Sequence, residues 1–128
     1  MGTLAITPTR TLMFINENEG WEKTITSQSN EIPILKELLT DKPDTGVSPS
    51  SESAYFQEAL SNLKKELSML SELLKEQQQR LNDDIVAMEF YNFDALCSQD
   101  ILRNRIREAQ QHFIEMKCNF LRYLSAAI

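Results

Sequence analysis

The chain has 128 residues, 41% of them hydrophobic and 25% charged, and its formal net charge is −6. This composition is typical of one small folded domain, and the negative charge disfavours nucleic acid as a ligand because an acidic surface repels phosphate. The sequence contains no run of the roughly 18 apolar residues that a membrane span needs. The N-terminus lacks the basic start and apolar stretch of a secretory signal. We therefore expect a cytoplasmic or nuclear protein without a membrane span.

Residues 1–30 show no clear hydrophobic period, and we expect an irregular or docking segment there. Thr11–Ile15 could form a short strand or an extended docking peptide. Trp21 stands among polar residues, so it is either a loosely packed side chain or an anchor on another protein. Thr7 and Ser48 each precede a proline, which makes them candidate phosphorylation sites.

Residues 31–40 are predicted to form a short amphipathic helix capped by Asn30. A helix of this length is too short to be stable alone, so it must dock on the rest of the chain or on another protein. It carries a Leu-x-x-Leu-Leu string, Leu35, Leu38 and Leu39, which is a possible docking motif. Residues 41–51 are rich in turn residues and read as a linker.

All glycines and prolines lie before residue 50, which allows long uninterrupted helices beyond it. From Phe56 onward, apolar residues recur at intervals of four and three, the heptad pattern of a coiled coil, and predict a helix over about 52–91. Gln77 and Asp84 occupy heptad core positions. A polar residue there can fix register or partner choice at a cost in stability. Alternatively, the seam opens and Ile85 takes over the buried face.

The heptad pattern breaks near residue 92, where we expect a turn before a second helix over about 99–127, with Ser98 as its N-cap. One continuous helix is the alternative. The predicted fold is all-α: a long helical hairpin over 52–128 with coiled-coil-like packing, preceded by the short helix and the irregular segment. The apolar surface exceeds what a hairpin can cover. A further helix from residues 31–40, a second copy or another protein should complete the core.

Few residues suggest reaction chemistry. Glu108, His112 and Glu115 could share one helix face and bind a metal, but di-metal bundles use carboxylates and histidines from several helices, so we favour a solvated polar face. The two cysteines, Cys97 and Cys118, are too few for a disulfide framework, and we expect both to be small buried hydrophobes in a reducing compartment.

Arg103, Arg105 and Arg107 form a local basic cluster, which we interpret as solvated or partner-facing charges. No catalytic, cofactor-binding or metal-binding residue is predicted. The single histidine leaves no persuasive arrangement for nucleophilic catalysis.

The sequence therefore predicts a non-catalytic helical protein–protein interaction module, a scaffold or adaptor subunit of a larger assembly. Its partner would be another helical protein or a second copy. The alternative is a small acidic helical chaperone for an exported or unfolded client. The predicted partner-binding residues are the apolar residues of the two-helix seam: Leu60, Leu63, Leu67, Leu70, Leu74, Leu81, Ile106, Phe113, Met116, Phe120, Leu121 and Leu124.

Overall fold

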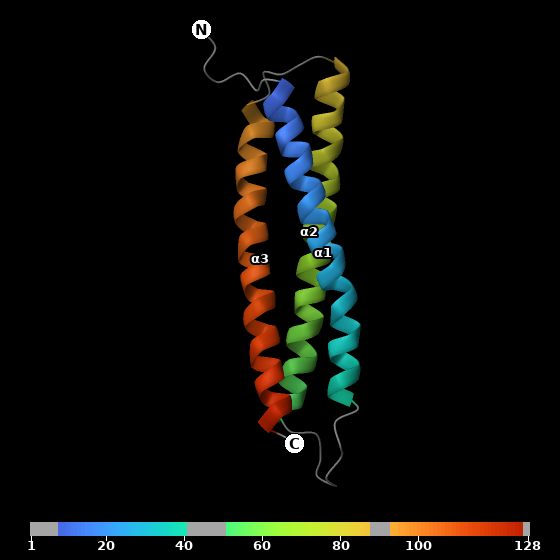
Figure 1. Ribbon diagram of the computed structural model, residues 1–128, viewed down its shortest axis with the longest axis vertical. Coiled ribbons are helices and arrows are strands. Elements are labelled where there is room, and N and C mark those ends of the chain that lie inside the picture. The colour runs from blue at the N-terminus through green and yellow to red at the C-terminus, as the bar shows by residue number, and fades with distance from the viewer. Residues whose placement is uncertain (1–7, 41–50, 88–92, 127–128) are drawn as a thin grey trace.

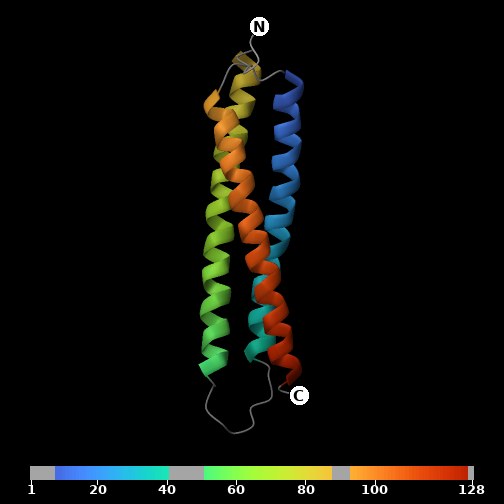
Figure 2. The same cartoon turned by 90° about the vertical axis from the view of Figure 1, so that its left-hand side faces the viewer.

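The protein folds into three long helices that pack side by side along a common axis (Figure 1). The computed structural model describes residues 8–40, 51–87 and 93–126. Helix α1 spans Pro8–Thr40, α2 spans Ser51–Ala87 and α3 spans Phe93–Ala126. Each helix runs opposite to the one before it, and the two views agree on this arrangement (Figures 1 and 2). The expected all-α fold is confirmed.

The first helix differs most from the prediction. An irregular segment over 1–30 and a short helix over 31–40 were expected, but a single helix of 33 residues runs through residues 8–40, and residues 1–7 lie outside the described part of the chain. The strand considered for Thr11–Ile15 is therefore wrong. Pro8 stands at the first helical residue, where its missing N–H costs nothing. No atom lies within 4 Å of a Cβ built on Gly20, so this glycine reflects no tight packing.

The second and third helices run antiparallel to each other, and their ends differ from the predicted ones. The second was predicted over 52–91 and ends at Ala87, while residues 88–92 lie outside the described part of the chain. The third was predicted from residue 99 and begins at Phe93, so Ser98 lies inside α3 and is not its N-cap. Residues 41–50 of the expected linker also lie outside the described residues.

The core runs along the centre of the three helices, and α1 supplies the additional helix that the hairpin needs. Leu60, Leu67 and Leu74 of α2 are fully buried, and Ile25 and Ile32 of α1 pack in the same cluster. Each such side chain contributes roughly 1.5–3 kcal/mol when removed from water. The apolar heptad face of α2 is therefore buried against other helices of the same chain.

An aromatic group closes the end of the core near residue 56. The ring of Phe56 meets the ring of Phe120 edge-on, with centroids 5.5 Å apart, and lies 5.0 Å from the ring of Tyr123. An edge-to-face pair such as Phe56–Phe120 adds about 0.5–1.5 kcal/mol beyond its buried area. The three rings join the start of α2 to the end of α3.

Candidate interaction surface

Most of the predicted seam residues lie inside this chain's own core. Nine of them are buried, Met116 and Leu124 are half-buried, and Leu121 is 44% exposed. The buried members are Leu60, Leu63, Leu67, Leu70, Leu74, Leu81, Ile106, Phe113 and Phe120. A partner that docks on the closed bundle would meet other side chains first, so their role in binding a partner stays a prediction.

The candidate docking residues of α1 are divided between core and surface. Leu35 and Leu39 are buried in the core, whereas Leu38 is 44% exposed. Trp21 is half-buried against the core, and the guanidinium of Arg103 lies 5.9 Å from its ring centroid. The candidate phosphorylation sites Thr7 and Ser48 lie outside the described residues.

A buried polar layer joins the three helices: Asn18 of α1, Gln77 of α2 and Gln99 of α3. The amides of Asn18 and Gln99 form a reciprocal pair. Gln99 Nε2 donates to Asn18 Oδ1 at 2.7 Å, and Asn18 Nδ2 donates to Gln99 Oε1 at 3.2 Å. Gln77 Nε2 donates to the same Gln99 oxygen at 3.1 Å and to the carbonyl of Ala95 at 2.9 Å. These hydrogen bonds offset the cost of burying the amides.

An ion pair continues the polar layer to the surface. Arg103 Nε and Nη2 donate to the two carboxylate oxygens of Glu17 at 2.9 and 2.7 Å, and Gln99 Nε2 donates to Glu17 Oε1 at 2.8 Å. Burial raises the pKa of Glu17, but hydrogen bonds from Arg103 and Gln99 and the charges of Arg103 and Arg107 outweigh it and lower this pKa. The hydrogen bond to Glu17 in turn raises the pKa of Arg103. Of the predicted basic cluster, Arg103 is thus paired with α1, whereas Arg107 acts on Glu17 only through its charge.

The polar layer separates the main core from a small second cluster formed by Phe14, Leu81 and Ala95. Gln77 therefore stays in the heptad core, while Asp84 and Ile85, one turn beyond Leu81, are both half-buried. When a buried polar side chain can form its hydrogen bonds in only one alignment of the helices, it favours that register over registers in which the helices are shifted. We interpret the layer as the feature that fixes how α1 aligns with the hairpin.

The heptad pattern identified Gln77 but missed the other two amides of the layer, Asn18 and Gln99. A signal was present, because Asn18 belongs to a seven-residue series, Thr11, Asn18, Ile25, Ile32 and Leu39, whose members are all buried. Gln99 likewise begins a series that continues with Ile106, Phe113 and Phe120. A search for seven-residue spacing that accepts polar as well as apolar residues would have identified both amides as core residues.

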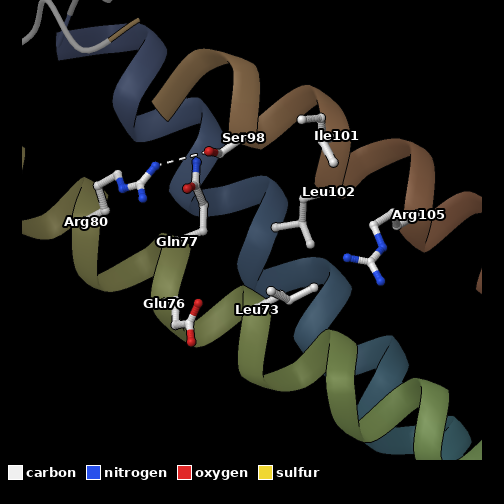
Figure 3. A pocket seen from close by; sticks show the side chains of 8 residues that line it. All are labelled: Leu73, Glu76, Gln77, Arg80, Ser98, Ile101, Leu102 and Arg105. Carbon is white, nitrogen blue, oxygen red and sulfur yellow. Dashed lines mark hydrogen bonds between the residues drawn. The ribbon is translucent and has the colours of Figure 1, made fainter. Parts of the chain in front are cut away.

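A shallow groove runs between α2 and α3 on the side facing away from α1; we call it the outer groove. Figure 3 shows its upper hollow, with α1 behind it, lined among others by Leu73, Ile101 and Arg105. Arg80 closes this end by donating to Ser98 Oγ at 3.0 Å. The exposed fractions of Met69 and Ile101 are 54% and 60%.

A second hollow continues the outer groove toward the other end of the bundle. Tyr55, Glu58, Glu66, His112 and Met116 line it, and Tyr55 is 62% exposed. Apolar side chains therefore follow the groove along most of its length, with charged residues at its rim. Shallow apolar grooves with a polar rim are the usual form of a protein-binding surface.

The residues considered for chemistry lie at the surface. His112 is exposed, and its Nδ1 lies 3.4 Å from Glu66 Oε1. Within the described residues, no group of three His, Cys, Asp or Glu side chains is placed to hold a metal ion. Cys97 and Cys118 are both free and exposed, so the prediction of buried thiols is wrong. Both flank the stripe of α3 that faces the core.

Among the helices that the structure describes, none is long and apolar enough to cross a membrane. Comparison of the chain with protein-family models, with curated protein sequences and with solved structures finds no match.

Proposed function

We propose that the protein is a non-catalytic helical interaction module that acts as a scaffold or adaptor subunit, with another helical protein or a second copy as its partner. The observation that carries the proposal is the outer groove: Leu73 and Ile101 line its upper hollow, and the exposed Met69 lies beside Arg105 of that hollow, although the core is complete. Exposed apolar side chains aligned along a two-helix groove suit a partner helix.

This arrangement favours a folded partner over the unfolded client of a chaperone. The leucine seam that such a client would need is covered by α1, and the accessible apolar surface is a narrow groove with charges at its rim. A rigid helix fits such a groove because its apolar side chains recur along one face.

The test compares two exposed isoleucines. Ile101→Asp places a charge in the outer groove, whereas Ile34→Asp makes the same change on α1, at a side chain that is 58% exposed and lines neither hollow. The full chain with each substitution is purified from the cells that produce it, and its mass and bound proteins are measured. We expect wild type and Ile34→Asp to carry a stoichiometric folded helical partner or a second copy, and Ile101→Asp to lose it.

Equal association of both variants would contradict the proposal, as would a wild-type chain that associates with no protein. Selective binding of unfolded clients would favour the chaperone.

A further inference from the structure

We propose that the occupant of the outer groove is the outer groove of a second copy, in an antiparallel dimer whose twofold axis passes through Met69. This inference rests on the proposed function and names its partner and contact surface. It follows from how charges and apolar side chains are distributed along the groove.

The two ends of the outer groove carry opposite charge. The upper hollow contains Arg80 and Arg105 with Glu76, whereas the lower hollow contains Glu58 and Glu66, with His112 Nδ1 3.4 Å from Glu66 Oε1. Two copies packed in parallel would place their basic ends together and their acidic ends together, so that like charges would repel. Copies packed in opposite directions set the basic end of one against the acidic end of the other. Such complementary charges favour association and fix orientation.

The spacing of charges along α2 also supports an antiparallel dimer. Arg80 lies eleven residues beyond Met69, and Glu58 lies eleven residues before it. At 1.5 Å per residue, each charge is about 16 Å from the level of Met69. A twofold axis at Met69 therefore brings Arg80 of each copy to the level of Glu58 of the other.

The side chains of α3 follow the same symmetry. Ser98 pairs with Arg80, which places Ile101 about 12 Å above the level of Met69. His112 contacts Glu66, which places Met116 about 10 Å below that level. The twofold axis thus sets the exposed Ile101 of one copy against Met116 of the other.

The centre of the interface would be built by Met69 and its neighbour Arg105. Arg105 Nη2 lies 3.5 Å from Met69 Sδ in the same chain. Glu66 lies one turn below Met69, so the axis brings Arg105 of one copy beside Glu66 of the other. Methionine suits such a contact because its side chain is flexible and polarisable.

The size of the groove is sufficient for a stable dimer. From Tyr55 to Arg80, α2 extends for about 38 Å, and two helices side by side present a face roughly 20 Å wide. The face therefore offers about 750 Å² per copy, close to the roughly 800 Å² per partner of a standard protein interface.

The experiment exchanges charges across the proposed contact. In light scattering, the wild-type chain should have twice the 14.8 kDa mass of one chain. Arg80→Glu creates a Glu–Glu contact at both symmetric positions, and Glu58→Arg creates an Arg–Arg contact there. Each should weaken dimerisation about tenfold or more. An equimolar mixture of the two variants should recover the dimer, because both contacts in the heterodimer are again oppositely charged.

Controls separate this contact from general charge effects and from folding. Glu37→Arg on α1 and Lys75→Glu on α2 make the same charge changes at exposed residues that line neither hollow, and should leave the dimer intact. Circular dichroism should report unchanged helix content for every variant. Met69→Glu, which places two carboxylates at the axis, should give a monomer that neither charge variant rescues.

Two results would overturn the proposal: a wild-type chain that stays monomeric at high micromolar concentration, or charge variants that are not rescued by mixing. If the monomeric chain then binds a different helical protein and loses it on Met69→Glu, the second-copy proposal fails and the proposed function stands. If it binds none, both fail.

Discussion

The polar layer predicts a strong coupling between two distant amides. Gln99→Leu removes the hydrogen bond from Gln99 Nε2 to Asn18 Oδ1, and this buried oxygen loses its donor. The other groups keep partners: Asn18 Nδ2 still donates to Gln78 Oε1 at 2.9 Å, and Gln77 still donates to Ala95. One orphaned buried acceptor costs about 1–3 kcal/mol, so the free energy of unfolding should fall by that amount.

Adding Asn18→Leu to Gln99→Leu should recover most of the lost stability, because the double variant no longer contains the orphaned oxygen. Asn18→Leu alone should be mild, at about 0.5–1.5 kcal/mol, since Gln99 keeps Gln77 and Glu17 as partners. The two effects should therefore fail to add, with a coupling of about 1–3 kcal/mol.

The assay is urea unfolding followed by far-ultraviolet circular dichroism, with the four chains of the cycle measured at one concentration. Gln111→Leu is the matched control, because Gln111 lies exposed on α3 and bonds only along its own helix to Glu115. It should change stability by less than about 0.5 kcal/mol. Additive effects of Asn18→Leu and Gln99→Leu would contradict this prediction, because they would mean that the two amides do not depend on one another.

Three further predictions concern the core, the ion pair and the thiols. Phe120→Ala should cost about 3–5 kcal/mol in urea unfolding because the ring is fully buried, while Ile114→Ala, at a side chain 59% exposed, should cost little; equal losses would contradict the core assignment. The pKa of Glu17 is lowered from 4.5, so its stabilisation is present above this pH and is lost as the pH falls through the depressed value. The urea midpoint of Glu17→Gln should accordingly depend less steeply on acid pH than that of wild type, and parallel profiles would exclude this role. Cys97 and Cys118 should both react with a maleimide in the folded protein, as mass spectrometry would show; protection until unfolding would contradict their exposure.

The α2–α3 pair could be predicted from sequence because its core positions are apolar and evenly spaced. Leu60, Leu67 and Leu74 recur every seven residues, and the stretch around them contains neither Gly nor Pro. Burial of such a stripe follows from the hydrophobic effect, whichever surface covers it. The sequence pattern does not show which surface covers this stripe, because apolar side chains gain similar free energy of burial against any well-packed neighbour.

The first helix could not be predicted in the same way, because polar Thr11 and Asn18 occupy core positions and break the apolar pattern. Asn18 is buried only because Gln99 and Gln78, more than fifty residues away in sequence, supply its hydrogen bonds. Such pairing is invisible to a local pattern.

The C-terminal part could therefore be predicted to be helical, with the leucines at its heptad core positions buried. The packing of the three helices shows in addition that α1 covers these leucines, and it shows which apolar side chains remain on the outer groove. Burial depends on local periodicity, whereas the choice of neighbour depends on shape and on hydrogen bonds between residues that the chain brings together only on folding.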